Sequence, residues 1–249
     1  ESPYSFTTVD ELLADFARRL GKEVDVEKYE SLAASVRQAI LNKWFDEKTG
    51  VVATGSQACQ AFALWLGILP EDSRVKAAKH MQEDLVNNDY RITTGNLCTR
   101  YLFDILTEYG YIEDAWKLIT REEYPSFGYM IEQEATTIWE RFELKKHPGM
   151  NSHSHPMYGA VGYWFYAYLA GIVPTGPGYE TVRIKPYYPE KLLSVTANVA
   201  TPKGDLTVRW VKRYGQTHLY VTTPFGVRAE IYADGKVHPH GSGSHHFTF

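Results

Sequence analysis

The stretch PTGPGYE, residues 174–180, decides the fold, because the sequence changes its pattern there. Before it, apolar residues recur every three or four positions, which is typical of amphipathic helices. After it, apolar and polar residues alternate in short runs between turn signals, which is typical of strands. We therefore expect two domains, one over residues 1–174 and one over residues 175–249.

The first domain carries a series of helical patterns joined by short links. They are VDELLADFARRL from residue 9, EKYESLAASVRQAILNKWF from 27, SQACQAFALWLGIL from 56, SRVKAAKHMQEDLVNN from 73, NLCTRYLFDILTEYG from 96 and YIEDAWKLIT from 111. With the apolar run at 161–173 the pattern predicts about seven helices, and the short links favour antiparallel hairpins. In the first helix Thr8 or Asp10 fits the N-cap, and one apolar face is expected at Leu12, Leu13, Phe16, Ala17 and Leu20.

The second domain reads as short strands. Alternation is clear in TVRIKPYY, LSVTANVA, DLTVRWVKRY, THLYVTTP and RAEIYAD, with turns such as PKGD, RYGQ and ADGK between them. This spacing predicts an antiparallel β-sandwich of about 70 residues. The fold class is thus mainly α with a C-terminal all-β domain.

Composition excludes several classes of partner. The formal charge of −4 is spread without long basic runs, so neither nucleic acid nor an anionic membrane surface is expected as a partner. The longest apolar run, 161–173, is shorter than the ~20 residues that span a bilayer, and it reads as a buried helix. No signal-peptide pattern opens the sequence, which leaves a bacterial cytoplasmic, periplasmic or secreted location open.

The two cysteines, Cys59 and Cys98, both lie in apolar helical patterns. Small thiols are common in helix cores, and two cysteines are too few for a secreted disulfide scaffold. We expect free thiols. Aromatic residues make up 14% of the chain, with eighteen tyrosines, and rings with a polar edge admit a carbohydrate ligand as well as ordinary packing.

The segment from Tyr124 to Tyr158 matches no single period and is rich in Pro, Gly, Ser, His and aromatic residues. Irregular segments of this length within a compact domain are usually disordered or functional. Disorder would expose the rings of Phe127, Trp139 and Phe142 to water, so we take the segment as the candidate site.

Within this segment Glu140 stands between Trp139 and Arg141. Burial beside an indole disfavours an ionised carboxylate while a guanidinium favours it, and such opposed effects set the pKa of a general base. A structural Glu–Arg pair at a helix end is the alternative reading.

Three histidines follow, His147, His153 and His155. A metal site is one reading, but no cysteine lies nearby and no HExxH motif exists, so no metal is expected. We instead expect His155 and Asn151 to hydrogen-bond a hydroxyl-rich ligand. No P-loop or dinucleotide fingerprint occurs, so no cofactor is expected.

Several stretches together resemble a known family. TTGNLCTRYL (93–102), YPSFGYM (124–130), ATTIWER (135–141), MNSHSHPMYGAVGYWFYAYLAGI (150–172) and PGYETVRIKP (177–186) are similar to the C-terminal half of the bacterial and fungal α-L-rhamnosidases of glycoside hydrolase family 78. The resemblance implies an (α/α)6 barrel, present here only in part, followed by a β-sandwich. It also implies release of terminal α-L-rhamnose with inversion.

The same resemblance assigns roles to residues. The glutamate of the family's WER motif falls on Glu140 as general base, the pocket histidine falls on His155, and Trp139 lines the sugar site, with Arg141 and Asn151 beside it. The family's general acid belongs to an acidic motif that residues 1–133 do not contain. The expected partners are therefore a rhamnose-containing glycoside and an upstream half of the enzyme, or a partner chain, that covers the open barrel face.

Two departures from the family pattern stand out. Glu134 occupies the position of a common glycine, and Phe142 that of a tryptophan. With the acid missing, a non-catalytic carbohydrate-binding or assembly module is the alternative function.

Overall fold

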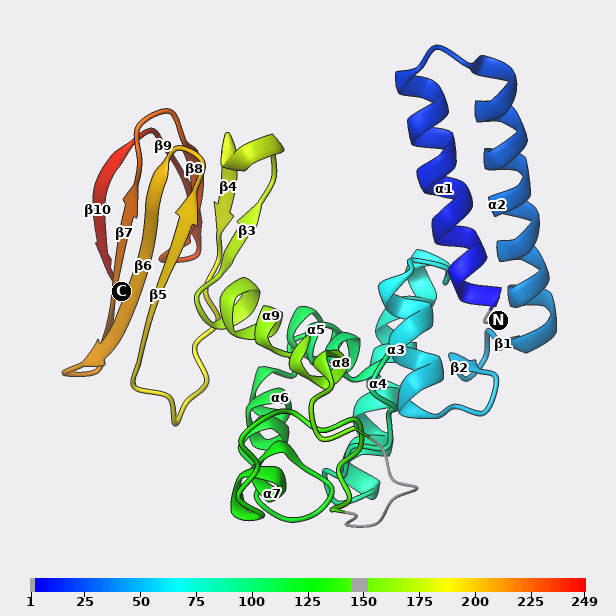
Figure 1. Cartoon of the computed structure of the whole chain (residues 1–249), viewed down its shortest axis with the longest axis horizontal. Helices are drawn as coiled ribbons and strands as arrows, with labels where there is room; N and C mark the ends of the chain where they lie inside the picture. The colour runs from blue at the N-terminus through cyan, green and yellow to red at the C-terminus, as the bar shows by residue number, and fades with distance from the viewer. Residues whose placement is uncertain (1–2, 145–151) are drawn as a thin grey trace.

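The computed structural model describes residues 3–144 and 152–249, with side chains described from residue 9 onward. Helices come first and strands follow (Figure 1). The helical part consists of α1 (Pro3–Arg19), α2 (Glu23–Trp44), α3 (Gln57–Trp65), α4 (Glu71–Asn87), α5 (Thr99–Glu108), α6 (Ile112–Ile119), α7 (Phe127–Glu132), α8 (Pro156–Gly159), α9 (Gly162–Trp164) and the π-helix η1 (Phe165–Leu169), with a short hairpin of β1 (Phe45–Asp46) and β2 (Val51–Val52) between α2 and α3.

The long helices pack as successive pairs, α1 with α2, α3 with α4 and α5 with α6, and α3 also lies against α5. The end of α5 shows how the sequence closes one of these helices. Gly110 has a φ of +90°, its N–H donates to Thr107 O, and the N–H of Tyr111 donates to Leu106 O. This is a Schellman cap, in which glycine supplies the left-handed residue at low cost, and it turns the chain directly into α6.

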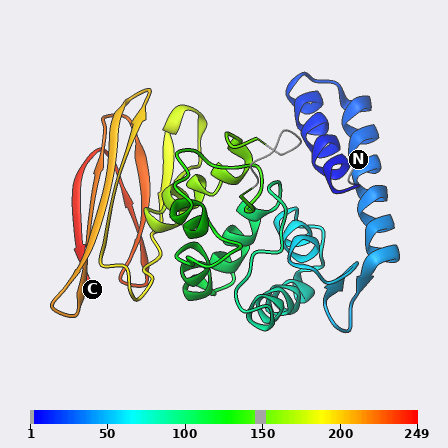
Figure 2. The same cartoon turned by 60° about the horizontal axis from the view of Figure 1, so that its bottom comes forward.

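Helix α1 differs from the prediction in two ways. It begins at Pro3, so the N-cap expected at Thr8 or Asp10 is wrong. The expected apolar face is largely exposed, with exposed fractions of 52% for Leu12, 57% for Phe16 and 70% for Leu20. Of the expected face only Ala17 is buried, together with Ala14, because α1 packs chiefly on α2. Figures 1 and 2 show this hairpin at one end of the molecule and the strands at the other.

The strands form a two-sheet sandwich. One sheet has the order β10-β7-β6-β5 and the other β3-β4-β8-β9, and every pair is antiparallel except β4 with β8. The strands are β3 (Ile172–Pro174), β4 (Thr181–Ile184), β5 (Ser194–Thr201), β6 (Gly204–Arg213), β7 (Gln216–Thr223), β8 (Arg228–Ala233), β9 (Lys236–His240) and β10 (Gly243–Thr248), and the 3₁₀ turn η2 (Pro177–Tyr179) joins β3 to β4. Helices followed by a sandwich are the predicted fold class.

The two parts meet at a tight junction. The indole N–H of Trp210 donates to Leu169 O at 2.7 Å, and the N–H of Tyr187 donates to Tyr168 O at 2.9 Å. Gly171 has a φ of +75°, and a Cβ there would lie 2.2 Å from the backbone of Lys185. Backbone therefore touches backbone at this point, which only glycine permits.

The final apolar run is not the fully buried helix that the sequence suggested. It forms α9, then η1, and its last residues enter β3. Trp164, Ala167 and Leu169 are buried, but Phe165 and Tyr166 are 41% and 50% exposed. Among the described residues no helix is both long and apolar enough to cross a bilayer. Cys59 and Cys98 are free thiols, as expected.

A fully buried glutamine ties three elements of the helical part together. The side chain of Gln60 on α3 accepts the N–H of Val52 at 2.7 Å and donates to Gly50 O at 2.9 Å and to Ala77 O at 3.2 Å. It thus satisfies buried backbone groups of the β1–β2 hairpin and of α4.

Replacing this glutamine tests how much the helical part depends on it. Gln60→Met keeps the size of the side chain but leaves the Val52 N–H and its carbonyl partners unpaired, so we expect a loss of about 2–4 kcal/mol in the free energy of unfolding. Urea unfolding of the whole chain, followed by circular dichroism at 222 nm, which reports mainly on the helices, measures the change in this free energy. The control is Gln38→Met, because Gln38 bonds only the exposed Asn42 side chain. Equal stability of the two variants would contradict the assignment.

Candidate active site

The candidate segment begins with an unusual helix cap. The N–H of Glu134 donates to Ile131 O and that of Ala135 to Met130 O, which is the Schellman pattern at the end of α7. Glu134 occupies the position that glycine normally takes, and it has a φ of +59°. The departure seen in the sequence therefore has a conformational consequence. Glu134 is exposed and does not line the pocket described below.

The chain then pairs with itself across the irregular segment. The N–H of Glu140 donates to Ser152 O at 3.0 Å, and the N–H of His155 donates to Ile138 O at 2.8 Å. The hydroxyl of Thr137 also donates to His153 O. Glu140 is thereby held on a backbone pair rather than on a helix or sheet.

The same pairing fixes the Glu140 side chain. Its Oε2 accepts the backbone N–H of Ser152 at 3.0 Å, and its backbone carbonyl accepts the Asn96 Nδ2–H at 3.4 Å. The carboxylate is held without an arginine or lysine partner among the described residues. A carboxylate held in this way keeps a second oxygen available for a water molecule or a ligand hydroxyl.

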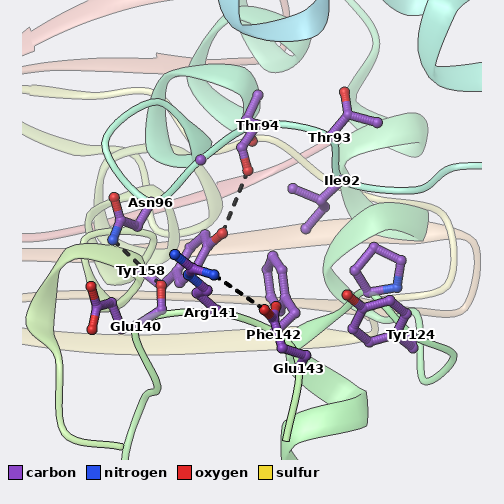
Figure 3. A pocket seen from close by; sticks show the side chains of 12 residues that line it. Ile92, Thr93, Thr94, Asn96, Tyr124, Glu140, Arg141, Phe142, Glu143 and Tyr158 are labelled. Atoms are coloured by element: carbon purple, nitrogen blue, oxygen red, sulfur yellow. Dashed lines mark hydrogen bonds and ion pairs between the residues drawn. The ribbon is translucent and has the colours of Figure 1, made fainter. Parts of the chain in front are cut away.

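Glu140 lines a pocket of about 490 Å³. Figure 3 shows Glu140 and Asn96 on one side of it and Tyr124 on the other, with Arg141 and Glu143 between them. The full lining is Ile92, Thr93, Thr94, Gly95, Asn96, Tyr124, Pro125, Glu140, Arg141, Phe142, Glu143 and Tyr158. Four separate stretches of chain therefore build one cavity of the size that small ligands occupy.

The pocket contains both an exposed ion pair and a buried tyrosine. Arg141 lies 3.5 Å from Glu143, in an exposed ion pair. Tyr158 is buried, and burial together with the nearby Glu143 raises its pKa to about 12. Its hydroxyl stays protonated at neutral pH and donates to Thr94 O at 3.5 Å. Tyr158 thus gives the pocket a neutral group that can take part in hydrogen bonds.

The other predicted site residues lie differently. Trp139 is 4% exposed and its ring lies 4.9 Å from that of His153, so it packs beneath the segment and does not line this pocket. His155 precedes α8, and its Nδ1 is buried without a hydrogen-bond partner among the described residues. Asn151 and His147 lie outside the described residues. The described part of the chain contains no group of three His, Cys, Asp or Glu arranged for a metal ion.

Sequence reasoning did not single out Asn96, Tyr124, Glu143 or Tyr158, which line the pocket. Asn96 precedes α5 and is separated from Glu140 by 44 positions. A glycine–asparagine pair just before a helix was the available signal, but nothing in it indicates which later segment it meets.

Comparison with known proteins places the chain. The model of the bacterial alpha-L-rhamnosidase 6 hairpin glycosidase domain matches residues 4–169, and that of the bacterial alpha-L-rhamnosidase C-terminal domain matches residues 171–247. The chain belongs to the bacterial alpha-L-rhamnosidase family. The resemblance noted in the sequence and the partial six-hairpin barrel are confirmed.

Curated members of the family include an alpha-L-rhamnosidase of Formosa agariphila, 35% identical over 88% of this chain and 24% of its own length. One of Streptomyces avermitilis is 31% identical over 94% of this chain and 25% of its own length. The chain thus spans about a quarter of the curated relatives it matches.

Solved structures of alpha-L-rhamnosidases have the same fold over nearly the whole of this chain. The Streptomyces avermitilis alpha-L-rhamnosidase complexed with L-rhamnose superposes with a TM-score of 0.92 at 31% identity, covering 99% of this chain and 26% of that one. The alpha-L-rhamnosidase of Dictyoglumus thermophilum gives 0.91 at 33% identity, over 98% of this chain and 31% of that one.

The cap of α7 generates a test of local strain. A non-glycine residue in the left-handed region costs about 1 kcal/mol, so we expect Glu134→Gly to raise the free energy of unfolding by about 0.5–1 kcal/mol. Thermal unfolding measures the change. Glu132→Gly, inside the last turn of the same helix, is the control and should lower stability. Loss of stability in both variants would mean that the Glu134 side chain stabilises the cap.

Proposed function

We propose that this chain is the C-terminal portion of an inverting glycoside hydrolase that releases terminal α-L-rhamnose, with Glu140 as the general base. Membership of the family and relatives named alpha-L-rhamnosidase support the substrate class. The observation that carries the proposal is the Glu140 carboxylate, held by Ser152 N–H at the wall of a 490 Å³ pocket. Rhamnose binding by the site is part of the same proposal.

In this mechanism Glu140 takes a proton from a water molecule, whose oxygen attacks the anomeric carbon. The bond from that carbon to the leaving oxygen breaks, and a second carboxyl group donates a proton to the leaving oxygen. Inversion requires the two carboxyls to stand about 6.5–9.5 Å apart, with the sugar and the water between them. Glu140 supplies one half of this pair.

The second carboxyl is expected from outside this chain. Glu143 also lines the pocket, but it lies 3.5 Å from the Arg141 guanidinium. A neighbouring positive charge favours the ionised carboxylate, whereas a general acid must hold its proton near neutral pH. The general acid therefore belongs to the remaining three quarters of an enzyme with the length of the relatives.

The exposed face of α1 fits the same picture. Leu12 and Phe16 on α1 and Leu20 just after it follow at intervals of four residues, and all three are more than half exposed. Contiguous apolar surface on a soluble protein usually marks an interface. We propose that the upstream part of the barrel, in the same polypeptide or in a partner chain, covers this face.

The alternative is a non-catalytic carbohydrate-binding or assembly module. It is favoured by one observation, that within the described residues the only other carboxylate lining the pocket is ion-paired. The two functions differ in turnover, which the next experiment measures.

Glu140→Gln, introduced into a protein extended upstream to the length of the relatives, should abolish hydrolysis of an aryl α-L-rhamnoside. The amide keeps the shape of the side chain but cannot take the proton, and loss of a general base costs about 10²–10⁴-fold in rate. Binding of L-rhamnose should persist in isothermal titration. Glu132→Gln, an exposed change on α7, is the matched control and should keep its rate.

Near-full activity of the Glu140→Gln protein would remove Glu140 from the mechanism. Absence of turnover by the unmodified extended protein, together with retained binding of rhamnosides, would favour the binding module. Turnover by the 249-residue chain alone would mean that the second carboxyl lies within it or comes from another copy.

The proposed barrel interface gives a separate prediction. Phe16→Glu should change the stability of this chain by no more than about 0.5 kcal/mol, because the side chain is exposed. In the extended protein it would place a charge in a buried interface and should lower the unfolding temperature by several degrees or more. Differential scanning calorimetry of both lengths measures this. Ser31→Glu on the exposed surface of α2 adds the same charge as a control. Equal tolerance of Phe16→Glu in both lengths would exclude this face as the interface.

A further inference from the structure

A second hollow lies at the end of the sandwich that points away from the helices. Figure 1 shows the turn η2 at this end, whereas α9 lies at the opposite end of β3. Two adjoining cavities of about 550 and 450 Å³ share Arg228 and Gly241 as walls. They are formed where the loops before β4, before β8 and after β9 come together, and each is in the size range of ligand sites.

The first cavity contains polar groups that have no partners. The Nε2 of His240 is buried and makes no hydrogen bond with the described residues. Burial, together with His245 and His238, lowers the pKa of His240, so its ring is neutral at pH 7. A neutral imidazole has one donor and one acceptor nitrogen, and a hydroxyl group can satisfy either.

Two charged side chains of β8 line the same cavity. Arg228 and Glu230 make no side-chain hydrogen bond or ion pair with the described residues. A guanidinium offers several donors in one plane, and a carboxylate offers acceptors only. Together with His240 they provide both kinds of hydrogen-bonding group, which suits a ligand with several hydroxyls.

The second cavity carries an aromatic ring that packing does not explain. Phe225, in the turn between β7 and β8, is 89% exposed. The turn is held from the other side, because Lys203 Nζ donates to Gly226 O at 3.0 Å. An exposed ring on a fixed turn offers a flat apolar surface, on which the C–H groups of a sugar ring can stack.

Other ligand classes fit less well. Lys203 and Arg228 are balanced by Glu180 and Glu230 in the combined lining, so the hollow has no positive excess to attract phosphate or nucleic acid. Pro239 interrupts the edge strand β9 and has no N–H to donate, which disfavours addition of a peptide strand there. A neutral ligand rich in hydroxyl groups remains.

We propose that this hollow is a second carbohydrate-binding site, which takes a neutral saccharide remote from Glu140. Phe225 stacks on one sugar ring, and Arg228 and His240 hydrogen-bond its hydroxyls. The proposal does not rest on hydrolysis at Glu140. It gives the sandwich a role in holding a glycan.

The test is a titration of the ¹⁵N-labelled 249-residue chain with L-rhamnose, methyl α-L-rhamnoside and maltotriose, each followed by amide chemical shifts. At least one saccharide should shift the amides of residues 225–228 and 240–242 in a saturable way. Phe225→Ala should weaken that binding about tenfold. Tyr214→Ala is the matched control, because Tyr214 is a fully exposed ring on the β6–β7 turn and lines neither of these two cavities. The amides of residues 92–96, which line the first pocket, should give a different Kd or no shift.

Three results would overturn the proposal. The first is no saturable shift of these amides with any of the three sugars at about 10 mM, well above a weak Kd of about 1 mM. The second is equal weakening by Phe225→Ala and Tyr214→Ala. The third is a single common Kd for these amides and for those of residues 92–96, which line the first pocket, because it would mean that the sugar binds only at the first pocket and acts on the sandwich indirectly.

Discussion

The candidate site depends on one exchange of hydrogen bonds between Glu140 and Ser152. The N–H of Glu140 donates to the backbone carbonyl of Ser152, and the N–H of Ser152 donates to the side-chain carboxylate of Glu140. No helix or sheet carries Glu140, so this exchange alone sets the position of its carboxylate. At Ser152 only backbone groups take part, so this position tolerates many side chains, whereas position 140 needs its carboxylate and neither tolerates a change in the path of the chain. The helices on either side serve to bring the two segments together at this point.

The sequence predicted elements better than contacts. Periodicity located α2 to α6, and Gly110 marked the end of α5, because these signals are local. It failed on α1, since periodicity shows that a helix has an apolar face but not whether a partner covers that face. The boundary between residues 174 and 175 stays a prediction, although β3 at Ile172–Pro174 already pairs with β4.

For the site, residue types were informative only within one segment. Glu140 was chosen from its neighbours and the family resemblance, and the structure places it in a pocket. Asn96 reaches the same pocket from another segment, and Tyr158 reaches it from the far end of the same segment, through contacts that no local pattern encodes. Trp139 was expected at the sugar; its ring lies 4.9 Å from that of His153 and does not line this pocket, so its role at the sugar stays a prediction. An aromatic residue next to a catalytic candidate in the sequence can pack against the segment that carries the candidate, rather than contact the ligand.

The junction at Gly171 bears on how the molecule moves. Trp210 and Tyr187 of the sandwich part bond the carbonyls of η1, and the chain passes from α8 through α9 and η1 into β3 without a flexible linker. A joint of this kind transmits displacement rather than absorbing it. Tyr158, a wall of the pocket, belongs to the same continuous segment. The sandwich therefore supports the pocket, and we expect a displacement of the sandwich to move Tyr158 as well.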